Sequence, residues 1–296
     1  MDFKTFTKKY LDDFNTYLLS HIENKSGTSL EEAMNYSLDA KGKRLRPLLL
    51  LAVLHSFHQP IKNGYEAAAA LEMVHTYSLI HDDLPAMDND DLRRGKPTNH
   101  IQFNEATAIL AGDALLTLAF EILTKGDLHS EVKLALIQKL AITSGYEGMV
   151  GGQQADIDGE KKQLTLEEIE RIHFRKTGAL IEMATVSGGI IANKSEHILK
   201  KLAELASEIG IAYQIRDDIL DVVGSEEELG KGVATDATLE KSTYPSLLGI
   251  DESFIQLEQR LTKAEQIIFS IAEMDDQFQT DLLISFIHQL SLEEYK

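Results

Sequence analysis

Cysteine is absent from the 296-residue sequence. The chain therefore forms no disulfides and offers no thiolate ligands, so any metal it binds must be held by oxygen or imidazole. A chain without cysteine also fits the reducing conditions of the cytosol. The first residues, beginning Met1-Asp2-Phe3-Lys4, lack the apolar core of a signal peptide. We therefore expect a cytoplasmic protein.

Proline and long apolar runs are also scarce. There are only five prolines and no extended glycine- or serine-rich tract, so nothing marks a linker and we predict a single domain over residues 1–296. The longest apolar run, Leu48 to Leu54, is far shorter than the roughly 20 residues that cross a bilayer. We expect no stable membrane insertion.

Negative charge outweighs positive charge, which gives a formal net charge of −19. Nucleic acids and anionic membranes would be repelled over much of such a surface, so we expect neither as a partner. The sequence has no glycine-rich dinucleotide loop, no Walker loop, no Gly-x-Ser-x-Gly elbow and no His-Glu-x-x-His helix. Hydride transfer, P-loop chemistry and acyl hydrolysis therefore lack support.

Helical spacing dominates the chain. Apolar residues recur three and four positions apart, as in Phe3, Phe6, Tyr10 and Phe14, and no stretch shows the sustained alternation of a strand. Long helices joined by short loops predict an all-α fold, a large helical bundle around a central cavity. The predicted helices cover residues 2–24, 29–39, 47–58, 64–84, 105–124, 130–150, 166–192, 195–223 and 246–294, the last with a break.

One acidic cluster lies on the predicted helix 195–223. Asp217 and Asp221 are four residues apart and Gln214 lies three before Asp217, so the three share one helical face. Buried anions of this kind are most simply neutralised by a hard cation such as Mg2+. The alternative is a solvated stripe paired with a nearby cation, but Arg216 is expected to point elsewhere. The burial itself is predicted from apolar neighbours, namely Ile215, Ile219, Leu220, Val222 and Val223.

Asp82, Asp83 and Asp88 form another acidic cluster, at the end of the predicted helix 64–84. A spacing of six would place Asp88 away from the face of Asp82 on a continuous helix. Pro85 resolves this, because it ends or kinks the helix and lets the chain fold back toward Asp82. Carboxylates near a helix C-terminus are disfavoured by the helix dipole, so a bound cation would relieve the conflict.

Two basic segments suggest an anionic ligand. Arg93 and Arg94 follow the carboxylates of Asp82 and Asp83 closely, and Mg2+ together with arginine forks suits a bound diphosphate. The segment from Gly42 to Pro47, Gly-Lys-Arg-Leu-Arg-Pro, precedes an apolar helix that Pro47 is expected to open as its first residue. On spacing alone, an anion site and a solvated basic turn fit this segment equally well.

In combination, these motifs resemble those of the trans-prenyltransferases, the short-chain polyprenyl diphosphate synthases, and within them the bacterial farnesyl diphosphate synthases. Gly42 to Pro47 resembles the family's homoallylic-substrate motif. Asp82 to Asp88, with Arg93 and Arg94, resembles the first aspartate-rich motif, and Asp217 to Asp221 resembles the second. The resemblance implies an isoprenoid-synthase fold, isoprenyl diphosphate substrates, a homodimer, and a cluster of three Mg2+ ions.

The resemblance also implies roles for individual residues. It assigns metal binding to Asp82, Asp88 and Asp217, with support from Asp83 and Asp221. It assigns the allylic diphosphate to Arg93, Lys176 and Lys231, and the diphosphate of isopentenyl diphosphate to Lys43, Arg46, His75 and Arg94. Thr177 and Gln214 would face the developing allylic cation, and Gln153 matches a further position in the pocket.

The reaction implied is a magnesium-dependent, head-to-tail condensation of isopentenyl diphosphate with dimethylallyl or geranyl diphosphate, by ionisation, condensation and elimination. Tyr77, five residues before Asp82, resembles the bulky floor of the chain-elongation pocket in the bacterial farnesyl type, so a C15 product is expected. A geranylgeranyl diphosphate synthase is one alternative, and a noncatalytic helical subunit of a heteromeric prenyl synthase is another. A terpene cyclase would not need the segment Gly42 to Pro47.

Overall fold

The structure, a computed structural model, describes residues 1–22, 27–40, 42–160, 162–223, 243–292 and 295. Within these residues the fold is helical, as predicted, apart from one short hairpin. The helices are α1 (Phe3–Leu19), α2 (Ser29–Leu38), α3 (Leu45–Ser56), α4 (Tyr65–Asp82), α5 (Asn99–Gln102), α6 (Glu105–Leu123), α7 (Ser130–Ser144), α8 (Met149–Gly159), α9 (Leu166–His173), α10 (Ala179–Ile191), α11 (Glu196–Val223), α14 (Tyr244–Leu248), α15 (Ile250–Met274) and α16 (Asp281–His288).

The predicted elements differ from the structure in several places, beginning with the helix predicted over 2–24, which ends at Leu19. The predicted helix 130–150 is divided into α7 and α8, because Gly145 and Gly148 both leave the helical conformation. A side chain at Gly148 would place its Cβ 2.0 Å from the carbonyl oxygen of Thr143. The predicted helix 166–192 contains a π-helical turn, Phe174–Gly178, between α9 and α10. The hairpin of β1 (Leu92–Arg93) and β2 (Lys96–Pro97) was not predicted, since strands of two residues show no period.

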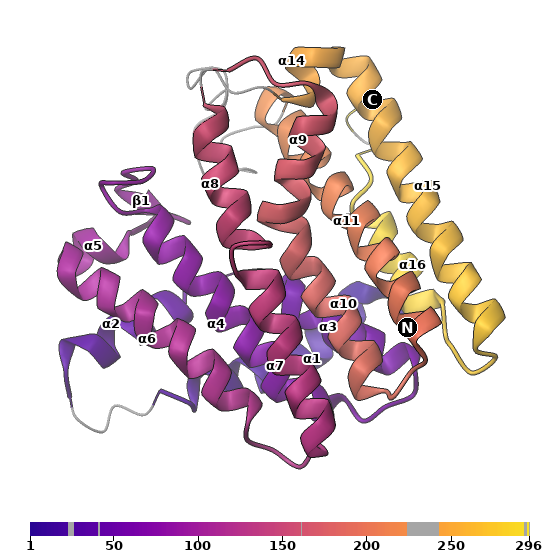
Figure 1. Ribbon diagram of the computed structural model, residues 1–296, viewed down its shortest axis with the longest axis horizontal. Coiled ribbons are helices and arrows are strands. Elements are labelled where there is room, and N and C mark those ends of the chain that lie inside the picture. Colours follow the sequence, from indigo (N-terminus) through magenta and orange to yellow (C-terminus); the bar gives the residue numbers. More distant parts are fainter. Residues whose placement is uncertain (23–26, 41, 161, 224–242, 293–294, 296) are drawn as a thin grey trace.

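The core is built around α3, α4 and α10, which are buried on nearly all sides. All seven residues of the apolar run from Leu48 to Leu54 are buried in α3, as expected for a central helix of a bundle. In Figure 1, α15 lies along one side of the molecule beside α11, and α6 lies on the opposite side across α4. These outer helices cover the core with one apolar face each.

Helix α6 is, among the described residues, the one helix long and apolar enough to cross a membrane. Core helices of globular proteins pass the same test, and α6 buries Ala108, Ala111, Gly112 and Leu115 in the bundle, where its main neighbour is α4. Its apolar composition is therefore explained in part by packing against α4.

Candidate active site

At the end of α4 the chain returns Asp88 to Asp82, as predicted from Pro85. The helix ends at Asp82, and Asp83 follows as its C-cap. Beyond Pro85 the chain doubles back, so that the backbone N–H of Asp88 donates to the carbonyl oxygen of Asp82 at 2.8 Å. The proline therefore does what the spacing required, and Asp88 lies beside Asp82.

The carboxyl of Asp82 is an anion in an unfavourable place. Burial raises its pKa to about 6, and the nearby carboxylates of Asp88 and Asp83 add to this rise, while Lys176 and Arg93 oppose it. Hard oxygen ligands that repel one another in a partly desolvated site fit a divalent cation.

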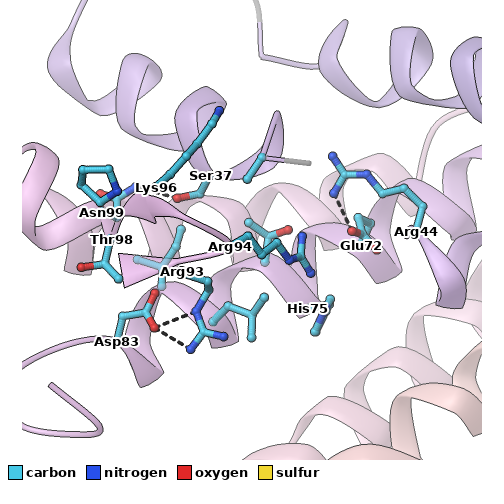
Figure 2. A pocket seen from close by; sticks show the side chains of 15 residues that line it. Ser37, Arg44, Glu72, His75, Asp83, Arg93, Arg94, Lys96, Thr98 and Asn99 are labelled. Atoms are coloured by element: carbon cyan, nitrogen blue, oxygen red, sulfur yellow. Dashed lines mark hydrogen bonds and ion pairs between the residues drawn. The ribbon is translucent and has the colours of Figure 1, made fainter. Parts of the chain in front are cut away.

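Asp83 is engaged by Arg93 rather than aimed at Asp82. Its Oδ1 accepts hydrogen bonds from Arg93 Nε at 2.7 Å and Nη2 at 2.6 Å, and the residue is only 3% exposed. Arg93 lies on β1, and the β1–β2 turn has positive φ angles at Arg94 and Gly95, as tight hairpin turns require. Figure 2 shows Arg93 turned toward Asp83. The hairpin therefore anchors the loop after α4.

Arg94 lies over Gly42, at the start of the basic segment. A Cβ at Gly42 would come within 2.3 Å of Arg94 Nη1, so a side chain at this position would displace the guanidinium. In Figure 2, Arg94 extends between the Asp83–Arg93 pair and the Arg44–Glu72 pair. With His75, these residues line a small cavity of about 40 Å³.

Arg44 has a structural role that the sequence analysis missed. It is 6% exposed and in the left-handed backbone region, with a φ of 47°. Its guanidinium donates to Glu72 at 2.6 Å, to Asn15 at 3.1 Å and to the carbonyl oxygen of Leu38. The signal for this role was Glu72, an acidic residue in an apolar stretch of α4. The interpretation of this segment as a solvated basic turn therefore does not hold for Arg44.

Arg46 and His75 meet beside this turn. Arg46 Nη1 lies 3.4 Å from His75 Nε2, and Arg46 Nε is buried with no hydrogen-bond partner among the described residues. Burial holds the pKa of His75 well below its usual value, and Arg46, Arg94, Arg93 and Arg44 lower it further. An imidazole surrounded by four guanidinium groups would suit a bound anion. Pro47 was predicted to be the first residue of α3. It is the third, because the helix begins at Leu45.

The second acidic cluster is on α11, and its carboxylates differ in burial. The Asp217 side chain is 47% exposed, whereas Asp221 is 4% exposed. Arg216 was predicted to point away from Asp217. This is wrong, since its side chain reaches to within 3.8 Å of the Asp217 carboxylate. The charge of Asp217 also acts on Arg46, whose pKa is lowered by burial and raised in part by Asp217. Val222 and Val223 are exposed rather than buried.

Gln214 and Asp218 are linked to each other. Asp218, which the sequence analysis did not single out, accepts from Gln214 Nε2 at 3.1 Å and from the backbone N–H of Tyr244 at 3.0 Å. This second bond fixes the start of α14 against α11. Asp218 therefore orients the Gln214 amide and joins two segments of the chain.

Lys176 and Thr177 lie on the π-helical turn. This turn is packed closely on α8, where a Cβ at Gly152 would lie 2.3 Å from the backbone nitrogen of Lys176. Burial lowers the pKa of Lys176, but Asp156, 2.6 Å from its Nζ, and more distantly Asp82 and Asp88 outweigh burial and raise it. Lys176 is therefore a cation facing the carboxylates that end α4. Lys231 lies outside the described residues.

A cavity of about 430 Å³ brings many of the predicted residues together. It lies between α4, α8 and the π-helical turn, and its lining includes the predicted residues Arg46, His75, Tyr77, Asp82, Gln153, Lys176 and Thr177. Met149, Val150 and Ile157 of α8 complete its apolar side; the sequence analysis missed them because apolar residues are common in helices. Lys43 is exposed and is not part of this lining. Throughout the described part of the chain, no three His, Asp or Glu side chains gather closely enough to hold one metal ion between them.

Comparison with known proteins gives the family. The polyprenyl synthetase profile matches residues 28–276. The chain belongs to the polyprenyl synthetase family. It is 50% identical over 283 residues to a farnesyl diphosphate synthase from Micrococcus luteus, covering 96% of each chain. It is 50% identical over 251 residues to the farnesyl diphosphate synthase of Bacillus subtilis (strain 168), covering 84% of this chain and 85% of that one.

The fold of this polyprenyl synthetase is also that of solved family structures. A geranyltransferase from Helicobacter pylori, complexed with magnesium and isoprenyl diphosphate, has a TM-score of 0.85 at 33% identity, with 96% of each chain covered. The predicted family and fold class are confirmed. The roles predicted for individual residues rest on the geometry described above.

The structural role of Arg44 can be tested on stability. Arg44→Ala should lower the free energy of unfolding by about 3–5 kcal/mol, because it leaves the Glu72 carboxylate buried without its partner. Lys43→Ala, in the same turn but exposed, should change it by no more than about 0.5 kcal/mol. Urea unfolding followed by circular dichroism gives both values. Equal losses in the two variants would contradict the structural role of Arg44.

Proposed function

We propose that this polyprenyl synthetase is a farnesyl diphosphate synthase. It condenses isopentenyl diphosphate with dimethylallyl or geranyl diphosphate, head to tail, and its product is farnesyl diphosphate. The farnesyl diphosphate synthases from Micrococcus luteus and Bacillus subtilis, at half identity over most of the chain, support this activity. The magnesium and isoprenyl diphosphate in the Helicobacter pylori structure support the substrate class and Mg2+.

The observation that carries the proposal is the opposite charge of two neighbouring groups at one cavity. Asp82, with its raised pKa, lies on one side, and Arg46 with the neutral His75 lies on the other. The allylic diphosphate needs a cation that stabilises its departing diphosphate group. The diphosphate of isopentenyl diphosphate needs a separate cationic site. One metal-binding half and one guanidinium half meet both needs.

We assign the metal ligands to Asp82, Asp88 and Asp217, and supporting roles to Asp83 and Asp221, for three Mg2+ ions. Mg2+ is bound in proteins by one or two carboxylates together with substrate phosphates and water, not by a closed protein cage. This fits two acidic clusters that do not form a complete ligand set by themselves. When bound, the ions supply Lewis-acid stabilisation of the departing diphosphate.

The chain's own residues bind and orient the two substrates. Arg93 and Lys176 bind the allylic diphosphate, and we include Lys231 in this set. The homoallylic diphosphate is bound by Lys43, Arg46, His75 and Arg94, with the buried Arg46 Nε as one donor. Thr177 and Gln214 direct oxygen dipoles at the allylic cation, the Gln214 amide nitrogen being held by Asp218. Gln153 lines the same cavity.

The experiment that tests this function is a condensation assay. The chain is incubated with isopentenyl diphosphate and dimethylallyl or geranyl diphosphate, with and without Mg2+, and the products are identified by mass spectrometry. We expect Mg2+-dependent C15 product, lowered at least about a hundredfold in Asp82→Ala and in Asp217→Ala because transition-state charge loses its stabilisation. Asp12→Ala, an exposed carboxylate on α1, is the control. Absence of product with every starter would refute the proposal, and full activity in both variants would refute the metal assignment.

Tyr77 is the proposed floor of the product cavity. It lies on α4, is 6% exposed and lines the cavity. Tyr77→Ala should lengthen the product from C15 to C20 because it opens space for one more five-carbon unit, whereas Tyr77→Phe should keep C15 because the ring remains. Chain lengths are read by mass spectrometry of the dephosphorylated products. Unaltered C15 in Tyr77→Ala would remove Tyr77 as the floor.

We also propose that the protein is a homodimer. Helices α6 and α7 pack on each other and expose large apolar side chains, among them Leu110 at 56% and Leu134 at 67%. Apolar side chains gathered on one face of a protein mark an interface. Leu110→Asp should shift the mass in sedimentation velocity toward the monomer, whereas Ile255→Asp, an equally exposed site on α15, should not. A monomeric parent chain would contradict the dimer.

A further inference from the structure

His81 closes the wall of the product cavity behind Tyr77. It lines the cavity and lies one residue before Asp82, at the end of α4. Its ring meets the ring of Tyr77 edge-on, with centroids 5.7 Å apart and an interplanar angle of 76°. The floor residue is therefore in contact with a second ring, which the sequence analysis did not single out.

The His81 ring is fixed on its far side by α6. Its Nε2 lies 3.1 Å from the backbone carbonyl oxygen of Ile109, which accepts a hydrogen bond from it, and 4.0 Å from Asp113 Oδ1. A polar contact with a helix backbone holds the ring in one orientation, which a purely apolar side chain of that size would not do. The ring thus spans the space between α6 and Tyr77.

Gly112 provides the place for this ring. A Cβ at Gly112 would lie 2.2 Å from His81 Nε2, 2.6 Å from Cδ2 and 2.9 Å from Cε1. These distances are far shorter than any tolerated contact, so a larger residue at 112 would push the ring away from α6. Because the ring also contacts Tyr77 and lines the cavity, we expect the displacement to be toward the growing chain.

We propose that His81, placed on Gly112, is a positioning residue that sets product length together with Tyr77. The inference rests on the proposed prenyl transfer and deepens it. Gly112 fixes how far the ring stands from α6, the ring supports Tyr77, and both rings together limit the depth of the cavity. Product length is then a property of the α4–α6 contact and not of one bulky side chain.

Substitutions on the two sides of the contact should change the product in opposite directions. Gly112→Ala should move the ring into the cavity and favour C10 over C15, whereas His81→Ala should open the wall and favour C20. We expect each product ratio to shift by about tenfold, the lower end of the discrimination that a methylene's worth of pocket volume gives. Tyr77 is unchanged in both variants, so the effect cannot come from its loss.

The double variant is the matched control. In Gly112→Ala with His81→Ala, the added methyl fills part of the space that the ring vacated, so the C10 product caused by Gly112→Ala alone should disappear. Thermal unfolding followed by circular dichroism checks that each variant is folded. A merely structural role for His81 would lower the total rate and leave the ratios of C10, C15 and C20 unchanged.

The outcomes separate this inference from the proposed function. A parent chain that forms no prenyl diphosphate refutes the function. A parent chain that forms C15, with C15 still the sole product of His81→Ala and of Gly112→Ala, overturns the role of His81 and leaves the function in place. If Gly112→Ala does not fold, the ratio in His81→Ala decides alone.

Discussion

The buried ion pair between Arg44 and Glu72 is the contact on which the geometry of the site depends. It fastens the basic turn before α3 to the middle of α4. Three residues further along α4, His75 meets Arg46, the second residue of α3. Without Glu72, the Arg44 guanidinium would be buried uncompensated beside two other arginines, which costs several kcal/mol, on the order of 3–5. The Glu72 carboxylate, in an apolar helix, thus allows a cluster of arginines to lie next to the folded core.

Helix α4 also carries several of the residues to which we assign roles in the proposed reaction. The proposed anion site at His75, the proposed floor at Tyr77 and the carboxylate of Asp82 follow one another on this helix. With a rise of 1.5 Å per residue, Tyr77 and Asp82 are separated by about 7.5 Å along the axis. A helix is stiff, so in the proposed reaction the number of residues between Tyr77 and Asp82 would set the distance between the reacting diphosphate and the end of the product cavity. In our proposal, the position of the Tyr77 ring across the cavity then depends on the neighbouring helix α6, through Gly112 and His81.

Features set by neighbouring residues could be predicted from the sequence, whereas contacts between residues far apart in the sequence could not. The return of Asp88 followed from Pro85, because proline acts on its own helix. The roles of Arg44 and Arg46 were not distinguishable from spacing, since Glu72, 28 residues away, decides which one is buried in an ion pair. The break between α7 and α8 escaped notice because Gly148 is required by a contact with the Thr143 carbonyl, which only the folded chain reveals. The hydrophobic periodicity, summed over whole helices, was enough for the fold class.

The acidic half of the site is maintained against the stability of the protein. Folding raises the pKa of Asp82 from about 4 to about 6, so between these values the folded state binds more protons than the unfolded state. Stability therefore falls as the pH rises through this range, and above it the full cost remains, on the order of 3 kcal/mol for a shift of this size. A cation with a bound diphosphate removes that cost because it favours the charged carboxylate. In the proposed reaction, binding of the metal–diphosphate complex would therefore stabilise the folded end of α4 and so couple substrate binding to local stability.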